Sequence, residues 1–360
     1  MRIAYDMTPA CTPFRSGVAR YCVCLADALA ALGERVEPWC RVSRWKVRAH
    51  AHRPGGARIR WWQDGIWPRR LSADVVHGTD VRIPRMSGPA RVATIHDVFH
   101  CLPGSEAWAT PVPRARVRRH YAETAAHAHA ICAVSAATRD DFLAHHRFPA
   151  DRVVVTPHGV DPRFRPHAPA EVAAARAALN LPGSYVLAVG ALAIRKNVPA
   201  LVRAWAASSL RPHLALVLAG EPTDDATAVH DAVRALGAES EVRFLDYVPD
   251  ALLPAIYAGA AVFACASHYE GFGIPLLEAM ASGVPVATSG RGALAEVAGG
   301  HAALADPTRI DSLSAALEQA VGIPADGRAV ARVHAATFTW ERTARATGEA
   351  YAIAIAALRG

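Results

Sequence analysis

Two glutamates, Glu270 and Glu278, lie eight residues apart, directly after an apolar run over residues 260–264. Carboxylates accept hydrogen bonds from hydroxyl groups, so a pair with this spacing suits a site that binds a sugar and a ribose. Gly271 and Gly273 lie between them and allow the backbone to approach a ligand closely. The pattern predicts that Glu270 orients a sugar and that Glu278 binds the ribose of a nucleotide.

The elements that must position these carboxylates are a buried strand and the helix after it. Residues 262–264 predict a buried parallel strand, and Pro275 suits the first turn of a helix that begins near Ile274. The free N–H groups at the start of that helix, with the positive end of its dipole, can hold a pyrophosphate without a metal. The spacing alone also fits an ordinary strand, turn and helix that carry two exposed glutamates.

At these residues the chain resembles the retaining glycosyltransferases of family 4, also called glycosyl transferases group 1. Their motif is an acidic residue, seven intervening residues and a second acidic residue, which Glu270 and Glu278 match. Further segments resemble the family in order along the chain: residues 16–21, 94–97, 134–138, 156–161, 189–197 and 218–221. One departure is Ala191, which stands after Gly190 where many relatives carry arginine.

The resemblance implies a retaining, metal-independent hexosyltransferase of the mannosyltransferase type. Its catalytic residues are expected to be His96, Arg195, Lys196 and Glu270. The donor-binding residues are expected to be Gly17, Gly190, Tyr247, Val248, Gly271, Phe272, Gly273, Ile274 and Glu278. In this scheme His96 contacts the donor sugar, and Arg195 and Lys196 stabilise the leaving diphosphate. We expect no metal and no cofactor, and we favour GDP-mannose as the donor, with UDP- and dTDP-sugars as alternatives.

Strand-like and helix-like segments alternate along both halves of the chain, which predicts two Rossmann-like, doubly wound α/β domains. Strands are expected over residues 2–5, 75–77, 92–96, 130–134, 185–189, 215–219, 242–245, 261–264 and 284–288. A stretch over 161–169 contains three prolines and predicts the hinge between an acceptor-binding domain, residues 1–165, and a nucleotide-sugar-binding domain, residues 166–337. The resemblance adds that these domains face each other across a cleft in the GT-B manner, and that a helix in 338–360 packs towards the N-terminal domain. A surface helix of the second domain is the alternative for that segment.

Composition predicts a globular protein, and the patterns below lead us to expect it in the cytoplasm. Hydrophobic residues make up 52% of the chain, but no apolar stretch reaches the ~18 residues of a membrane span. The first residues meet an acid at Asp6, so they predict a strand and not a secretion signal. Seven cysteines without a C-x-x-C pair indicate reduced thiols.

The basic residues are concentrated in the first half of the chain. Residues 1–170 hold 25 Lys and Arg against 14 Asp and Glu, whereas residues 171–360 hold 14 against 18. Residues 39–70, here the Trp/Arg segment, carry five of the eight tryptophans among many arginines. Such a segment suits the anionic inner face of the cell membrane, an aromatic platform for a glycan or lipid-linked acceptor, or a plain surface with stray aromatics. Nucleic acid is not an expected partner, because the arginines are scattered and no recognition motif accompanies them.

Two functions of other classes compete with this interpretation. Residues 290–295 match the dinucleotide fingerprint, which suggests an NAD-dependent oxidoreductase. The match is assigned to the last strand of the second half, and the ~20 residues after it show no clear strand ending in a ribose-binding acid, so we disfavour that enzyme. The second competitor is a non-catalytic sugar-nucleotide-binding protein of an assembly complex. The presence of Glu270, Glu278, Arg195 and Lys196 argues against it.

Overall fold

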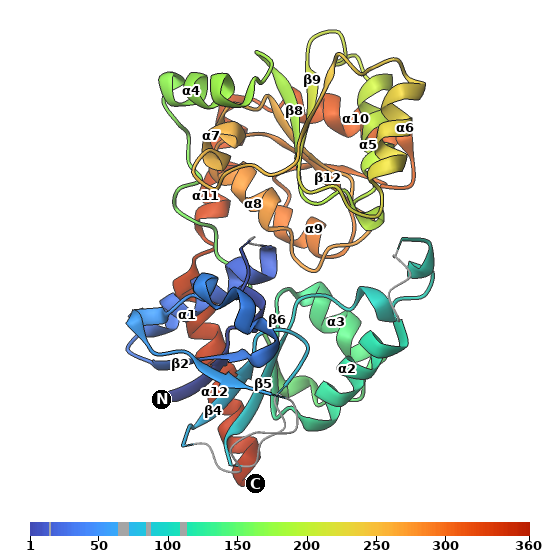
Figure 1. The fold of residues 1–360 in the computed structure, drawn as a ribbon. Helices are drawn as coiled ribbons and strands as arrows, with labels where there is room; N and C mark the ends of the chain where they lie inside the picture. The colour runs from blue at the N-terminus through green and yellow to red at the C-terminus, as the bar shows by residue number, and fades with distance from the viewer. Residues whose placement is uncertain (14–15, 64–71, 84–87, 109–113) are drawn as a thin grey trace. The chain divides into compact units, whose positions relative to one another are not determined.

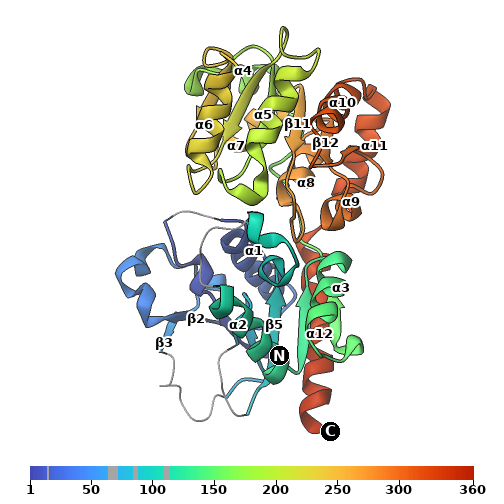
Figure 2. The same ribbon diagram turned by 90° about the vertical axis from the view of Figure 1, so that its right-hand side faces the viewer.

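The computed structural model describes residues 1–13, 16–63, 72–83, 88–108 and 114–360. The chain forms two compact units, each built on its own parallel β-sheet (Figures 1 and 2). The N-terminal unit comprises Met1–Pro103, Pro113–Gly159 and Phe338–Gly360, and the C-terminal unit comprises Gly104–Val112 and Val160–Thr337. The chain therefore passes into the second unit six residues before the end of the domain assigned from the sequence.

The N-terminal sheet has seven described strands in the order β3-β2-β1-β4-β5-β6-β7. Their bounds are β1 (Arg2–Asp6), β2 (Arg35–Arg41), β3 (Arg60–Trp62), β4 (Val75–Gly78), β5 (Ala90–Ile95), β6 (Ala130–Ala133) and β7 (Val153–Val155). The helices of this unit are α1 (Gly17–Ala31), α2 (Arg114–His127), α3 (Ala136–His145) and α12 (Trp340–Arg359). Short 3-10 turns connect the elements of this unit: η1 (Thr8–Ala10), η2 (Val42–His50), η3 (Pro54–Gly56), η4 (Phe99–Cys101) and η6 (Ala150–Arg152).

Helix α12, at the C-terminal end of the chain, belongs to the N-terminal unit and packs against α1, β5 and β6 (Figure 1). Its small and aromatic residues Ala350, Tyr351 and Ala354 are fully buried in the core of that unit. The hydroxyl of Thr343 donates to the carbonyl oxygen of Pro157 at 2.6 Å, which ties the helix to the end of the unit's last loop.

The C-terminal sheet has six strands in the order β10-β9-β8-β11-β12-β13. Their bounds are β8 (Tyr185–Val189), β9 (Ala215–Ala219), β10 (Val242–Leu245), β11 (Val262–Cys265), β12 (Val286–Ser289) and β13 (Ala303–Ala305). The helices are α4 (Pro169–Leu179), α5 (Val198–Ala207), α6 (Ala226–Ala235), α7 (Leu253–Ala258), α8 (Ile274–Ala281), α9 (Gly292–Ala298), α10 (Ile310–Val321) and α11 (Ala325–Ala336), with the turns η5 (Ser105–Trp108) and η7 (Ile194–Lys196). Two parallel-sheet, Rossmann-like units confirm the predicted α/β fold class.

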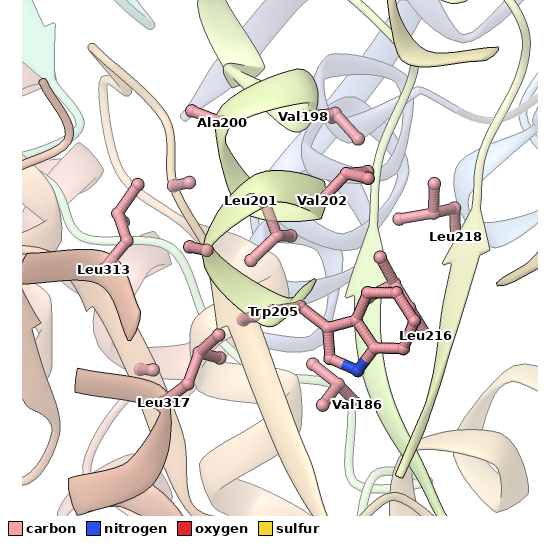
Figure 3. Packing of buried hydrophobic residues seen from close by; sticks show 14 of the residues in the cluster. Val186, Val198, Ala200, Leu201, Val202, Trp205, Leu216, Leu218, Leu313 and Leu317 are labelled. Atoms are coloured by element: carbon pink, nitrogen blue, oxygen red, sulfur yellow. The ribbon is translucent and has the colours of Figure 1, made fainter. Parts of the chain in front are cut away.

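Trp205 of α5 anchors the core between one face of the C-terminal sheet and its helices (Figure 3). The indole is fully buried, and its Nε1 donates to the carbonyl oxygen of Leu214 at 2.8 Å. Val186 and Leu216 of the sheet and Leu317 of α10 belong to the same cluster. Truncation of a buried tryptophan to alanine typically costs about 3–5 kcal/mol, so this core holds the strand ends firmly in place.

The Trp/Arg segment is only partly a surface. Trp39 in β2 and Trp62 in β3 are 5% and 3% exposed, and they pack with Ala4 and Val76. The hypothesis that the segment as a whole is an interface is therefore wrong for these two side chains, because they complete the edge of the sheet core. Trp45 in η2 is 48% exposed. Outside the described residues lie Trp67, Arg69 and Arg70 of the same segment.

Candidate active site

A charged triad occupies the carboxyl ends of β8 and β11, which are neighbours in the C-terminal sheet. The Glu270 carboxylate accepts a contact from Lys196 Nζ at 2.5 Å on Oε1 and from Arg195 Nη1 at 2.9 Å on Oε2. The hydroxyl of Ser267 donates to Glu270 Oε1 at 2.8 Å. The structure therefore brings together three of the four residues predicted to be catalytic.

The electrostatics of this triad keep Glu270 ionised. Burial alone would raise the pKa of Glu270, but the charges of Lys196 and Arg195 and the hydrogen bond from Ser267 lower that pKa to about 2. The triad therefore combines two cations with one anion at neutral pH and keeps a net positive charge. A site of this kind attracts an anion to the end of the sheet.

The loops that carry the triad are cross-linked through their backbones. Asn197 adopts a left-handed conformation with φ 55°, and its Nδ2 donates to the carbonyl oxygens of Ala266 and Pro307 at 3.2 and 2.7 Å. The backbone N–H of His268 donates to the carbonyl oxygen of Arg195 at 2.9 Å. These bonds hold the loop after β8 and the loop after β11 in one arrangement.

Two glycines are required where the backbone runs close to the triad. Gly190 has φ 139°, and a Cβ there would lie 3.3 Å from Cε of Lys196. Gly273 has φ 108°, and a Cβ there would lie 2.7 Å from a methyl carbon of Leu294. A hollow beside Lys196 and Gly190 is lined also by Cys265 and Ser267. The absence of a side chain at Gly190 thus leaves room in this hollow directly beside Lys196.

Helix α8 starts at Ile274 with Gly273 as its N-cap, as the glycines and Pro275 predict. Glu278 lies one turn into this helix and is 2% exposed. The side chain of Glu270 is 11% exposed. The alternative of two exposed surface glutamates is therefore wrong, because both carboxylates are enclosed at the end of the sheet. Phe272 is likewise buried, and Gly271 precedes it in the same loop.

Tyr247 and Val248 lie in the loop after β10, and Glu270 of the triad lies in the loop after β11. Two strands, β9 and β8, separate β10 from β11, which corresponds to about 14 Å at the usual strand spacing. Tyr247 is 53% exposed and Val248 is 8% exposed. The structure places these two residues along the same sheet edge, in the loop after its outermost strand on that side.

His96 follows β5 at the carboxyl edge of the N-terminal sheet. Its Nε2 donates to the carbonyl oxygen of Thr79 at 2.9 Å, and its ring stands edge-on to Tyr21 with centroids 4.7 Å apart. Burial lowers the pKa of His96 and, more strongly, that of His158, whose ring lies 5.5 Å away. Gly17 begins α1, after Ser16 has capped it by accepting from the N–H of Ala19. His96 thus lies in a cluster of buried rings at the end of this sheet.

Behind His96 lies a buried hydrogen-bond network that the sequence did not reveal. His77 Nε2 lies 2.8 Å from Thr94 Oγ1, and His77 Nδ1 lies 2.7 Å from the hydroxyl of Tyr351. Thr94 Oγ1 also lies 2.7 Å from the hydroxyl of Tyr21. Burial, with a smaller contribution from the charge of His96, lowers the pKa of His77 to about 3. This network connects β4, β5, α1 and α12 without using an ionised group.

Of the fingerprint-like residues 290–295, the first two form the turn after β12 and the other four begin α9. The sequence predicts that β12 is the last strand of the second half, but β13 follows it and pairs with it at the edge of the sheet. β13 is followed directly by Asp306. The prediction that no strand ending in an acid follows the fingerprint is therefore wrong. The short, alanine-rich β13 gave no strand signal. Asp306 accepts from Arg291 Nη2 at 2.9 Å and from the N–H of Thr308 at 3.0 Å, so its carboxylate closes the turn.

Ser267 and Asn197 support the triad but were not singled out from the sequence as site residues. Ser267 lies three residues before Glu270, a spacing at which a hydroxyl can reach a loop carboxylate. Asn197 follows the Arg195-Lys196 pair, and asparagine tolerates the left-handed conformation that it adopts here.

Among the described residues, no group of three His, Cys, Asp or Glu side chains could hold a metal ion. The same part of the chain contains no helix with the length and apolarity to cross a bilayer.

Two family models match the chain: Glycosyltransferase Family 4 over residues 15–164 and Glycosyl transferases group 1 over residues 172–330. The O-antigen chain mannosyltransferase B of Escherichia coli is 33% identical over 301 residues, which span 79% of this chain and 76% of that protein. The MMP alpha-(1->4)-mannosyltransferase of Mycolicibacterium hassiacum is 31% identical over 319 residues, 80% of this chain and 72% of that protein.

Solved structures share the fold over nearly the whole chain. The sucrose-phosphate synthase of Thermosynechococcus elongatus superposes with a TM-score of 0.77 at 21% identity, covering 97% of this chain and 98% of that one. Anabaena Alr3699/HepE, solved in complex with UDP and glucose, gives a TM-score of 0.73 at 17% identity, covering 97% and 98%. At these identities the likeness concerns the fold.

Proposed function

From the premise that this chain belongs to glycosyltransferase family 4, we propose that it transfers a hexose from a nucleotide sugar to a glycan or lipid-linked acceptor in surface polysaccharide biosynthesis. The observation that carries this proposal is the triad of Arg195, Lys196 and Glu270 at the carboxyl edge of the C-terminal sheet. Its two cations lie in η7, which is hydrogen-bonded to the loop that leads to α8, so a nucleoside diphosphate finds both cations beside the N-terminus of that helix.

The chemistry requires the leaving diphosphate to be stabilised as the anomeric carbon–oxygen bond breaks. Lys196 and Arg195 supply positive charge to the phosphate oxygen that receives the bonding electrons. Glu270 holds both cations in place and orients the donor sugar, and Glu278 accepts hydrogen bonds from the ribose. The acceptor oxygen forms the new bond on the same face of the sugar and passes its proton to the departing phosphate oxygen, so the anomeric configuration is retained.

GDP-mannose is the proposed donor, because two relatives that cover most of this chain are named mannosyltransferases. A UDP- or dTDP-sugar is the second candidate, since the HepE fold neighbour was solved with UDP and glucose. Turnover with GDP-mannose, UDP-glucose and dTDP-glucose tests this choice, and calorimetric titration with GDP, UDP and dTDP measures the base preference separately. Tight binding of a nucleoside diphosphate without turnover of any donor would favour the non-catalytic sugar-nucleotide-binding protein. The anomeric proton coupling of the product distinguishes retention from inversion.

We propose that no divalent metal takes part in the transfer, because side-chain cations and a helix N-terminus perform the task that a metal performs elsewhere. Turnover should be unchanged after dialysis against EDTA and in the presence of excess EDTA. A loss of activity that returns with Mg²⁺ or Mn²⁺ would contradict this proposal. Magnesium-saturated EDTA is the control for effects of the chelator itself.

We propose further that the enzyme acts in the cytoplasm as a peripheral protein on the anionic inner face of the cell membrane. Val42 and Trp45 are 42% and 48% exposed in η2, beside Arg44, Lys46 and Arg48. Each engaged Lys or Arg contributes about 1 kcal/mol near an anionic surface. The protein should sediment with anionic vesicles at low salt and dissociate as salt rises, because the Debye length shrinks below ~8 Å beyond physiological ionic strength. Equal binding to neutral vesicles would contradict the electrostatic attraction, and no binding to anionic vesicles at low salt would remove the membrane from the proposal.

A further inference from the structure

Two buried charged side chains at the carboxyl edge of the N-terminal sheet lack partners for part of their polar atoms. Asp6 ends β1 and Arg41 ends β2, and these strands are neighbours in the sheet. Asp6 is 2% exposed and Arg41 is 9% exposed. Within the described part of the chain, Asp6 Oδ2 and Arg41 Nε are buried without a hydrogen-bond partner. Buried polar atoms are nearly always paired in folded proteins, so two orphans at one edge require an explanation.

Among the described residues, only one of the two carboxylate oxygens of Asp6 has a hydrogen-bond partner. Oδ1 accepts from the backbone N–H of Thr8 at 2.9 Å. Burial and the neighbouring charge of Asp80 raise the pKa of Asp6 to about 6, although hydrogen bonds from Thr8 and the charge of Arg41 act in the opposite direction. An ionised Asp6 therefore destabilises the folded protein. A residue that weakens the fold at neutral pH is better explained by binding than by structure.

Arg41 is held in place without its Nε being used. Its backbone N–H donates to Thr8 Oγ1 at 3.0 Å, and its guanidinium carbon lies 4.9 Å from the ring centroid of Trp62. Thr8 thus fixes the strand ends that carry both orphan atoms. Arg41 and Asp6, which are both described, form no ion pair with each other, although the charge of Arg41 is felt at Asp6.

Thr79 links Asp6 to His96 through two hydrogen bonds. The hydroxyl of Thr79 donates to the carbonyl oxygen of Asp6 at 2.6 Å, and the carbonyl oxygen of Thr79 accepts from His96 Nε2 at 2.9 Å. Strands β2, β1, β4 and β5 are consecutive in the sheet, so their carboxyl ends present Arg41, Asp6, Thr79 and His96 in a row. Ligands of open α/β sheets bind outside the carboxyl ends of the strands.

We infer that Asp6 and Arg41 form a subsite for two adjacent hydroxyl groups of a sugar acceptor. Asp6 Oδ2 accepts a hydrogen bond from one hydroxyl, and Arg41 Nε donates to the oxygen of the next. A neutral polyol fits this pair better than an ion does, because Arg41 repels a cation while Asp6 and Asp80 repel an anion. The inference rests on the proposed function in one respect, which is that the bound polyol is the acceptor of the transfer.

The test measures binding and turnover separately. Saturation-transfer NMR without donor gives the affinity of the wild-type protein for octyl α-mannoside, octyl β-glucoside and octyl β-galactoside. For the glycoside that binds best, Asp6→Asn should weaken binding about 10-fold or more, as expected for a lost hydrogen bond to a charged group. Arg41→Lys should weaken it by a smaller factor, because the charge remains but Nε is lost. Both variants should bind the nucleoside diphosphate with unchanged affinity.

A matched control and a stability measurement exclude a trivial loss of fold. Glu37 is a buried carboxylate inside β2 whose Oε2, among the described residues, also lacks a hydrogen-bond partner, but unlike Asp6 it forms ion pairs, with Arg2 at 2.6 Å and with Arg35 and Arg60 at 3.4 Å. Glu37→Gln should therefore lower the urea midpoint and leave glycoside binding unchanged. Asp6→Asn should raise the urea midpoint at pH 8, because it removes a buried charge.

The outcomes separate this inference from the proposed function. If the wild-type protein binds none of the three glycosides, or if Asp6→Asn binds them as tightly as wild type, the subsite is refuted and water satisfies the orphan atoms. If Asp6→Asn loses binding but the wild-type protein transfers no sugar from any donor, the subsite stands and the proposed transferase function fails. Loss of acceptor binding together with a raised KM for the acceptor in the transfer reaction supports both.

Discussion

The carboxyl edges of the two sheets carry different chemistry on similar frameworks. In the C-terminal unit, Lys196, Arg195 and Glu270 form an ionised triad. In the N-terminal unit, His77 and His96 lie among aromatic rings, and burial lowers the pKa of both. The comparison teaches that a parallel sheet supplies the place for a site, while the loops after its strands decide whether that place handles charge or neutral hydroxyl groups.

The two edges also differ in what stabilises them. A buried ion group keeps its charge only when each member has a close partner, and removal of one partner leaves an uncompensated charge. The histidine network avoids that problem because its members remain neutral at pH 7. Changes at the charged edge should therefore act on turnover and ligand binding, whereas changes in the histidine network of the N-terminal edge should act on stability and its pH dependence.

The largest effect is expected from Lys196→Ala at the charged edge. Loss of a cation aimed at the leaving group typically lowers kcat by about 100- to 1,000-fold, and donor affinity should fall much less. Steady-state kinetics with the best donor and direct titration with its nucleoside diphosphate measure the two effects. Lys46 is the only other lysine in the chain and lies exposed in η2, so Lys46→Ala is the matched control. A Lys196→Ala enzyme with normal kcat would show that Lys196 does not stabilise the leaving diphosphate.

A smaller effect is expected from Glu278→Gln in α8. Loss of a charged hydrogen-bond acceptor for the ribose should weaken binding of the bare nucleoside diphosphate about 10-fold. Calorimetry measures this, with Glu239→Gln as an exposed control in the same unit. If the variant bound the nucleoside diphosphate normally and lost affinity only for the intact sugar donor, the roles given to Glu270 and Glu278 would have to be exchanged.

The sequence predicted those parts of the molecule whose signals are local. Strands β8, β9 and β10 were predicted residue for residue, because each is a short run with apolar residues bounded by turn residues. β2 was missed, because Glu37 and Pro38 interrupt its apolar pattern. Strands β3, β7 and β13 were missed because each has only three residues, too few to show a periodicity.

The chemistry of the site depended on contacts that no local pattern encodes. Glu270 meets Arg195 across 75 residues of sequence, so their types were predictable but their pairing was not. The stacking of Trp108 on His268, with centroids 4.6 Å apart, likewise follows from the tertiary fold and places residues 104–108 with the C-terminal unit. No sequence motif marks His77 as part of a network, because its hydrogen-bond partner Tyr351 lies 274 residues away in the chain.

The smallest of the three effects tests whether the histidine network of the N-terminal edge is neutral. Because the pKa of His77 is lowered to about 3 in the folded protein, the unfolded chain binds a proton between pH 3 and about 6.5 that the folded protein does not bind. The free energy of unfolding should therefore fall as pH falls through this window, and His77 should account for about 1.4 kcal/mol of that fall between pH 7.5 and 5.5.

His77→Gln removes this titration, so its unfolding free energy should depend less steeply on pH than that of the wild-type protein, whatever constant loss the substitution adds. Asp6 acts in the opposite sense below its raised pKa of about 6, but it is present in both proteins and drops out of the difference. Urea denaturation at pH 7.5, 6.5 and 5.5 measures the slope, with the exposed His213→Gln variant as the control for loss of a histidine. An unchanged slope in His77→Gln would mean that His77 accepts a proton inside the folded protein, and the contrast between the ionised triad and a neutral histidine network would then fail.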